Sequence, residues 1–291
     1  MMGDRLNGAT VRRNLRRGVY VIPTTLTVLN VFFGFTSILK SIQASHAAIA
    51  GDPAQAAHFF QLACWSLFAA AVFDTFDGLV ARLMNATSEF GKEYDSLADV
   101  VTFGAAPAVL VYTWGLHLWG RLGGGAAFLF LVAGSLRLAR FNISTAKTDH
   151  RYFIGLPIPA GALTLASIIA YAPYPVTDER FAAIMLVVTA FLGFAMVSTF
   201  KYRSQKYANL QKQRSFAYIL FFALLLVLMY RWTEEFFLVF FLAYVSSGPL
   251  MKLWSMLFPN RRTPTSPLVP PSGDRSAEVS DPLESTQPSS R

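Results

Sequence analysis

Long apolar segments alternate with short polar ones along most of the chain. The apolar segments lie at 24–41, 56–82, 94–119, 123–143, 157–173, 181–200, 215–231 and 235–257. Most of them approach the roughly 20 residues that a helix needs to cross the hydrocarbon core of a bilayer. A membrane barrel would instead show segments of about ten residues with alternating polarity. The pattern therefore predicts an all-α, multi-pass transmembrane helical bundle of about eight spans.

The composition agrees with a membrane protein. The chain is 54% hydrophobic and only 14% charged, whereas a soluble domain is typically about 25% charged. Its single cysteine, Cys64, lies inside an apolar segment. A lone cysteine excludes an internal disulfide and a thiolate metal site.

Polar segments flank the apolar region at both ends. Residues 1–18 are basic and lack the short apolar core and small-residue cleavage site of a secretory signal. We expect a basic cytoplasmic segment there, either an interfacial helix or a disordered arm. Residues 258–291 are rich in Pro and Ser, a composition typical of a disordered cytoplasmic tail. Residues 19–257 are then the transmembrane domain.

The net charge of +8 raises the possibility of nucleic-acid binding, but the charges are unevenly distributed. With eight spans and both termini in the cytoplasm, only Lys40, Arg121, Arg180 and Arg231 of the 25 Lys and Arg residues fall outside. Cytoplasmic loops of membrane proteins carry such an excess of basic residues. The natural partners of the basic rim are anionic membrane lipids, and no nucleic acid is expected.

Four aspartates interrupt two neighbouring apolar segments. Asp74 and Asp77 are three residues apart, and Asp95 and Asp99 are four apart. Both spacings place side chains on one face of a helix. A short loop at 85–91 makes the two helices antiparallel. At about 1.5 Å of rise per residue, all four carboxylates converge about one to three turns below the basic residues that border the loop.

The cost of burying these carboxylates indicates a function. An aspartate near the bilayer centre costs about 2.5–3.5 kcal/mol, and four of them close together repel one another. Oxygen ligands without Cys or His favour a hard cation, Mg²⁺ or Mn²⁺. Aspartates solvated in a loop or paired with Lys and Arg are the simpler reading of one such residue, but not of four at these spacings.

Small and basic residues accompany the aspartates. Gly78, Ala81 and Gly91 fall on or near the carboxylate face. They leave room for a bulky ligand, although small residues in membrane helices also mediate helix packing. Arg82 is suited to a phosphate through its planar fork, or to an interfacial position. The pattern leaves these alternatives open.

The two aspartate pairs and their neighbours resemble the signature of a known family. The sequence DTFDGLVAR at 74–82, followed after eight residues by GKEYDSLAD at 91–99, resembles the CDP-alcohol phosphatidyltransferases at all eight signature positions. Four further stretches resemble the membrane-integral phosphatidylserine synthases within that family. They are PTTLTVLNVFFGF, LRLARFN, FIGLPIPAGA and MVSTFKYRSQK.

The resemblance implies a reaction and a site. Such enzymes transfer a phosphatidyl group from CDP-diacylglycerol to an alcohol and release CMP. They are helical membrane bundles, often homodimers, with the nucleotide site at the cytoplasmic edge. By resemblance Asp74, Asp77 and Asp95 bind the cation, while Asp99 shares a second ion and is the candidate general base. The implied nucleotide site also contains Asp74, Asp77, Gly78, Ala81, Arg82 and Gly91.

L-serine is the acceptor that the resemblance implies. Arg137, Arg140 and Asn142 lie near the inner end of the fourth apolar segment, where they would bind the acceptor or a phosphate, or pair with lipid headgroups. Glycerol 3-phosphate, inositol phosphate and choline remain alternative acceptors. Asn30 either forms a hydrogen bond within the site or makes a helix–helix contact.

A transporter would also carry carboxylates within the membrane. Transporter sites usually lie near the midplane between repeated halves, but this chain shows no internal repeat and its four aspartates fall within residues 74–99. No Gly-x-Ser-x-Gly motif, phosphate-binding loop or His-x-Lys motif is present. The sequence therefore favours an enzyme of the bacterial cytoplasmic membrane, with its active site facing the cytoplasm.

Overall fold

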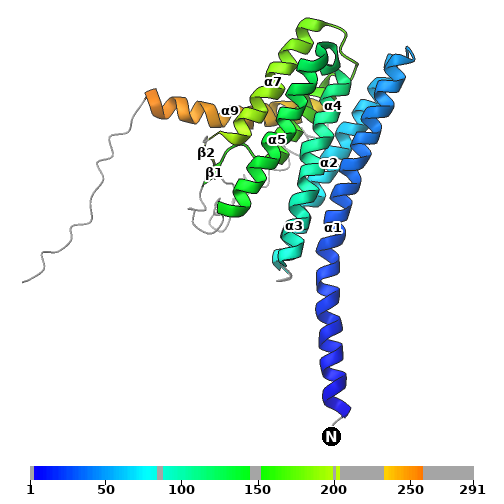
Figure 1. Cartoon of the computed structure of the whole chain (residues 1–291), viewed down its shortest axis with the longest axis vertical. Coiled ribbons are helices and arrows are strands. Elements are labelled where there is room, and N and C mark those ends of the chain that lie inside the picture. Colours follow the sequence, from blue (N-terminus) through cyan, green and yellow to red (C-terminus); the bar gives the residue numbers. More distant parts are fainter. Residues whose placement is uncertain (1–2, 84–87, 145–151, 199–200, 204–232, 258–291) are drawn as a thin grey trace, which may run out of the picture.

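Helices make up almost all of the described chain. The computed structural model describes residues 3–83, 88–144, 152–198, 201–203 and 233–257 (Figure 1). Its elements are α1 (Gly3–Ile49), α2 (Pro53–Leu83), α3 (Glu89–Asp99), the π-helical η1 (Val100–Ala105), α4 (Ala106–Trp114), the 3-10 helix η2 (Leu116–Trp119), α5 (Gly120–Ser144), β1 (Tyr152–Ile154), α6 (Ile158–Tyr171), α7 (Glu179–Val197), β2 (Lys201–Arg203) and α9 (Thr233–Leu257).

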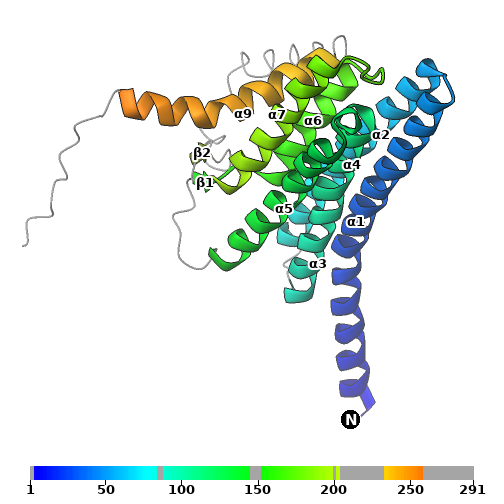
Figure 2. The same cartoon turned by 45° about the horizontal axis from the view of Figure 1, so that its top comes forward.

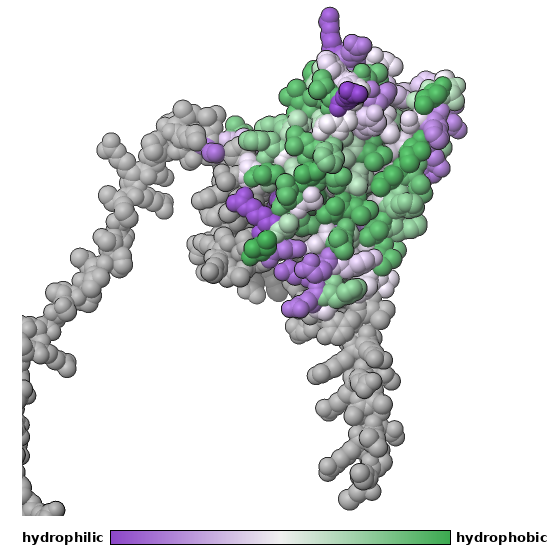
Figure 3. All heavy atoms as spheres, in the orientation of Figure 1, coloured by the Kyte–Doolittle hydropathy of each residue, from purple (hydrophilic) through white to green (hydrophobic). Residues whose placement is uncertain are grey.

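The described helices are those of an integral membrane protein. Five segments are long and apolar enough to cross a bilayer, namely Thr24–Ile49, Pro53–Val80, Glu89–Trp114, Leu116–Ile143 and Glu179–Val197. Large apolar side chains such as Phe32, Phe128 and Val187 are exposed on their outer faces. Apolar residues cover the middle of the face seen in Figure 3, and hydrophilic residues gather toward its ends. A soluble monomer rarely exposes so much contiguous apolar surface.

Three of the eight predicted spans are not among these five. Residues 215–231 lie outside the described part of the chain. The predicted span at 157–173 is the 14-residue α6, which at about 1.5 Å per residue is shorter than a bilayer core. The predicted span at 235–257 is α9, which crosses the other helices at a steep angle (Figures 1 and 2).

The first predicted span continues a longer helix. Helix α1 runs without interruption from Gly3 to Ile49, so the basic residues that precede the apolar segment belong to the same helix. Figure 1 shows this part of α1 extending beyond the end of the bundle at which α3 begins. The structure thus has one helix over the basic segment and the first predicted span.

A pair of short strands departs from the all-α prediction. β1 and β2 pair antiparallel, with Phe153 opposite Tyr202. They belong to the connections that follow α5 and α7. Each strand is only three residues long, and such a run contains too few residues to show an alternating pattern. The pairing satisfies backbone polar groups that a non-helical connection leaves open.

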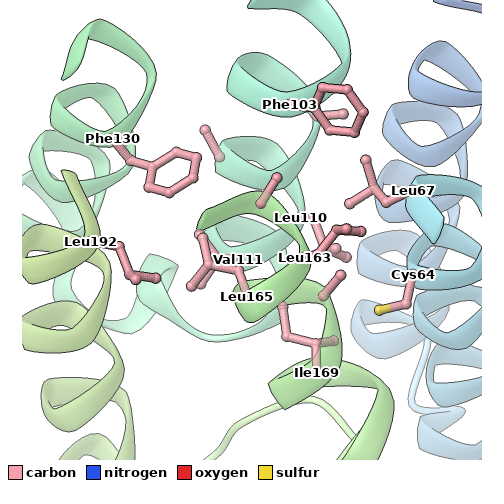
Figure 4. Close-up of a cluster of buried hydrophobic side chains, with 14 of the residues drawn as sticks. Cys64, Leu67, Phe103, Leu110, Val111, Phe130, Leu163, Leu165, Ile169 and Leu192 are labelled. Carbon is pink, nitrogen blue, oxygen red and sulfur yellow. The ribbon is translucent and has the colours of Figure 1, made fainter. Parts of the chain in front are cut away.

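The apolar core surrounds α6. This helix is apolar on all sides and is buried along nearly its whole length, as expected of a helix at the centre of a bundle. Leu163, Leu165 and Ile169 of α6 lie between Leu67 of α2 on one side and Leu192 of α7 on the other (Figure 4). The core therefore holds the outer helices in place around the short, buried α6.

The turn between α2 and α3 brings the aspartate-bearing helix ends together. Ser88 caps α3, because its Oγ accepts a hydrogen bond of 2.9 Å from the backbone N–H of Gly91. A serine at this position is a strong start signal for a helix. α2 therefore ends and α3 begins at the same end of the bundle, beside α1 (Figure 1).

Candidate active site

Three aspartates from two helices form one cluster. A carboxylate oxygen from each of Asp74 of α2, Asp95 of α3 and Asp99 of α3 lies within 4.8 Å of the other two. Asp99 is buried, and Asp74 and Asp95 are half-buried. Three oxygens at this separation match the donor set that a hard divalent cation prefers in proteins. The antiparallel helix pair thus places carboxylates from both helices around a cation-sized space.

Asp77 lies one turn away from this cluster and contacts a third helix. Thr27 of α1 donates a hydrogen bond of 2.9 Å from Oγ1 to Oδ2 of Asp77. Both side chains are buried. Thr27 was not predicted as a site residue, since a threonine in an apolar segment usually bonds to its own helix. α1 therefore lines one side of the site.

A short π-helix follows Asp99 and also packs against α1. Thr102 of η1 donates from Oγ1 to the backbone oxygen of Asn30 at 3.3 Å. Turns of this kind within helices are frequent at functional sites, because they change the direction of the side chains that follow. The end of α3, three residues before Thr102, is thereby held close to α1.

Most of the unpaired buried polar atoms lie around this cluster. Within the described residues, six buried side-chain nitrogen or oxygen atoms have no hydrogen-bond partner. Five belong to Asn30, Asp95, Asp99 and Arg137, and the sixth is Oγ of Ser37. Burying a polar group without a partner costs about 1–3 kcal/mol. The concentration of such atoms indicates that a polar or charged ligand binds here.

Arg137 approaches the cluster from α5. Its side chain is half-buried, its Nε is unpaired, and Nη2 donates weakly to the backbone oxygen of Gly155 at 3.5 Å. The guanidinium interacts electrostatically with Asp99 and with Tyr244 of α9. Tyr244 was not predicted as a site residue, because nothing in its sequence context distinguishes it from an ordinary aromatic residue of an apolar segment.

The other two predicted acceptor residues lie further along α5. Asn142 donates from Nδ2 to Oγ of Ser96 on α3, at 2.9 Å. This contact ties α5 to the residue that follows Asp95. Arg140 is exposed. Of the three residues predicted for the acceptor, Arg137 has a described interaction with Asp99 of the acidic cluster, and Asn142 contacts the neighbouring Ser96.

The predicted nucleotide-binding residues occupy the facing helix ends. Gly78 lies one residue after Asp77, and a Cβ built on it meets no atom within 4 Å. The N–H of Gly91 is used by the α3 cap. Ala81 and Arg82 belong to α2, but their side chains lie outside the described part of the structure. The space beside Gly78 is open to a ligand.

Comparisons with known proteins agree with this site. The chain is 37% identical to a protein of Helicobacter pylori over 65% of this chain and 74% of the relative. It is 34% identical to a protein of Methanocaldococcus jannaschii (66% and 78%) and 36% identical to one of Bacillus subtilis (50% and 76%). Each relative is named CDP-diacylglycerol–serine O-phosphatidyltransferase. The sequence model of the CDP-alcohol phosphatidyltransferases matches residues 20–196, and the chain belongs to this family.

Proposed function

We propose that this protein transfers the phosphatidyl group of CDP-diacylglycerol to L-serine, giving phosphatidylserine and CMP. The observation that carries the proposal is the cluster of Asp74, Asp95 and Asp99 on two facing helix ends, in a chain of the CDP-alcohol phosphatidyltransferase family. The choice of serine is supported by the names of the relatives from three organisms.

The acidic cluster is suited to a divalent cation, Mg²⁺ or Mn²⁺. Its donors are carboxylate oxygens, and the unpaired oxygens of Asp95 and Asp99 are buried. Asp74, Asp95 and Asp99 would hold the cation, together with Asp77 one turn away. Such an ion, when bound, neutralises a diphosphate and stabilises negative charge on the leaving group.

Asp99 is the candidate general base. A serine hydroxyl is a weak nucleophile until its proton is removed, and a positioned carboxylate serves this purpose. In the proposed step the serine oxygen bonds to the lipid-side phosphorus, the bond from this phosphorus to the CMP oxygen breaks, and the hydroxyl proton passes to Asp99. Asp99 is the one buried member of the cluster, which supports this role.

The nucleotide would lie against the facing ends of α2 and α3. Asp74, Asp77, Gly78, Ala81, Arg82 and Gly91 line this region in the proposal. The open space at Gly78 supports close approach of a ligand to the backbone. Arg82 would pair with a phosphate through its guanidinium.

Arg137 is the candidate partner for the acceptor's carboxylate. Two observations support this role, namely its unpaired Nε and the interaction of its positive charge with Asp99, the proposed base. A guanidinium pairs with a carboxylate through two parallel hydrogen bonds. The same charge opposes a cationic acceptor such as choline, while glycerol 3-phosphate and inositol phosphate remain chemically compatible. Arg140 and Asn142 would border the same acceptor region.

The membrane topology and assembly are also part of the proposal. We place residues 19–257 in the bacterial cytoplasmic membrane as eight spans, with the basic segment 1–18, the tail 258–291 and the active site on the cytoplasmic side. The excess of basic residues on that side supports the orientation. The family resemblance supports a homodimer. Reporter fusions at both termini test the topology, and crosslinking in native membranes tests the dimer.

The decisive experiment measures CMP release by the purified protein. It supplies CDP-diacylglycerol with Mg²⁺ or Mn²⁺ and compares L-serine with glycerol 3-phosphate, inositol phosphate and choline. We expect serine-dependent CMP release with phosphatidylserine as the lipid product. CMP release without serine, or a clear preference for glycerol 3-phosphate, would overturn the assignment of the acceptor.

A further inference from the structure

Thr27 and Asn30 lie on one face of α1 and differ sharply in their hydrogen bonding. Residues three apart share a helix face. Thr27 donates to Asp77 across the α1–α2 contact. Asn30, one turn further along, is fully buried, and neither Nδ2 nor Oδ1 of its carboxamide has a partner. An asparagine in this state is unusual, since buried polar side chains are nearly always paired.

The register between α1 and α2 gives the level at which Asn30 lies. The two helices are consecutive and antiparallel, with only a short turn between Ile49 and Pro53. The Thr27–Asp77 hydrogen bond fixes their register. Three residues forward on α1 and three residues back on α2 both move about 4.5 Å in the same direction. Asn30 is therefore level with Asp74, as Thr27 is level with Asp77.

The lean of the side chains is the same in both pairs. Helical side chains lean toward the N-terminus of their own helix. Thr27 and Asn30 therefore lean one way along the bundle and Asp77 and Asp74 the other, so the axial offset that the Thr27–Asp77 hydrogen bond bridges is repeated between Asn30 and Asp74. Asp74 is also a member of the three-carboxylate cluster.

The backbone at Asn30 is held in place from the other side. Its carbonyl oxygen accepts the hydroxyl of Thr102. One turn further along, Gly34 packs against Thr102 with no space for a Cβ. α1 thus has little freedom to rotate Asn30 out of the site. The unpaired amide is therefore held at the level of Asp74.

We propose that Asn30 is a positioning residue of the acidic site. When the cluster is ionised around a divalent cation, its Nδ2 donates a hydrogen bond to the carboxylate of Asp74, and so repeats the contact of Thr27 with Asp77. An ionised carboxylate only accepts hydrogen bonds, so a neutral donor orients it without adding charge. The inference rests on the proposed function only in using its cation site.

The test compares variants with and without a donor at this position. Asn30→Thr and Asn30→Val have nearly the same shape, but only threonine offers a hydroxyl, the group with which Thr27 reaches Asp77. Mn²⁺ binding to the purified full-length protein is measured by electron paramagnetic resonance without CDP-lipid or serine. Loss of a hydrogen-bond partner of a metal ligand typically weakens metal affinity about 10–100-fold. We expect this loss for Asn30→Val and partial recovery for Asn30→Thr.

Ser37→Ala is the matched control. Ser37 lies two turns further along the same face of α1, is fully buried, and also has an unpaired side-chain atom. Its replacement should leave Mn²⁺ affinity unchanged. Without the cation, Asn30→Val should not lower the temperature of thermal unfolding, because the variant removes an unsatisfied polar group.

Three results would overturn the inference. The first is wild-type Mn²⁺ affinity in Asn30→Val, and the second is equally weak binding in Asn30→Thr and Asn30→Val. The third is binding by Asn30→Asp that matches or exceeds the wild type, which would make residue 30 a direct oxygen ligand. Since no substrate is added, failure of the wild-type protein to release CMP with serine would count against the proposed function alone.

Discussion

Gly34 of α1 and Thr102 of η1 pack without room for one more carbon atom between them. A Cβ on Gly34 would lie 2.5 Å from Oγ1 of Thr102 and 2.8 Å from its Cα. The Cα cannot move aside by rotation of a side chain. Because Asn30 and Asp99 lie about one turn away on their elements, this contact sets the spacing between α1 and the end of α3 at the acidic cluster.

Gly34→Ala should therefore damage both stability and cation binding. The added methyl group forces α1 and η1 apart, and overpacking of this kind typically costs about 1–3 kcal/mol. We expect a lower temperature of unfolding and weaker Mn²⁺ binding. Gly125→Ala is the control, because a Cβ at this exposed helical glycine of α5 meets nothing within 4 Å. Equal behaviour of the two variants would show that the α1–η1 contact does not set the geometry of the site.

Divalent cations should stabilise the folded protein through the acidic cluster. Asp74, Asp95 and Asp99 repel one another when they are ionised, and a bound cation removes this repulsion. A ligand that binds only the folded state at about 100 times its Kd adds about 2.7 kcal/mol. The temperature of thermal unfolding of the wild type should be clearly higher with Mn²⁺ than with EDTA.

Asp95→Asn distinguishes stabilisation by Mn²⁺ bound at the cluster from nonspecific effects of the ion. The variant loses one negative charge, so it should unfold at an equal or higher temperature in EDTA and gain much less from Mn²⁺. Asp52→Asn is a suitable control, because Asp52 lies in the turn between α1 and α2 and is exposed. An undiminished Mn²⁺ effect in Asp95→Asn would exclude the cluster as the binding site.

The spacing of the aspartates predicts that all four carboxylates converge, and the structure brings Asp74, Asp95 and Asp99 together while Asp77 accepts a hydrogen bond from Thr27. Positions three and four apart on two antiparallel helices share a face, so the convergence of Asp74 with Asp95 and Asp99 follows from helix geometry alone. The arrangement of α1 could not be predicted in the same way. Thr27 and Gly34 contact residues 50 or more positions away, and nothing in their own segment specifies those partners.

The lengths of the elements were less predictable than their type. The apolar segment at 157–173 is continuous in hydrophobicity, but α6 within it is only 14 residues long and is buried along nearly its whole length by protein. Periodicity does not distinguish a helix surrounded by lipid from one surrounded by other helices. The π-helical turn after Asp99 likewise depends on packing against α1, which local sequence does not reveal.

Asp99→Asn should abolish turnover while leaving CDP-lipid binding largely intact. Asparagine preserves the shape of the side chain but cannot accept the serine proton, and loss of a general base typically costs about 10²–10⁴-fold in rate. Serine-dependent CMP release and CDP-diacylglycerol binding are measured on the same preparation, at saturating Mn²⁺. Turnover at the wild-type rate would rule out Asp99 as the base.

Arg137→Ala should weaken serine binding more than it slows the reaction. If the guanidinium pairs with the serine carboxylate, its loss removes a charge-assisted hydrogen bond of about 1.5–3 kcal/mol, or about 10–100-fold in affinity. The KM for serine should rise by that factor, while the KM for CDP-diacylglycerol changes little. Initial rates of CMP release over a range of serine concentrations measure both constants.

Arg121→Ala tests whether any such effect comes from general loss of charge. Arg121 is exposed at the opposite end of the same helix, α5, so its removal changes the net charge equally without touching the cluster. Arg137→Lys adds a further distinction, because an ammonium keeps the charge but loses the planar pair of donors. We expect this variant to fall between the wild type and Arg137→Ala for serine. If the KM for CDP-diacylglycerol rises in place of that for serine, Arg137 binds the diphosphate, and the acceptor's carboxylate must be recognised by another group.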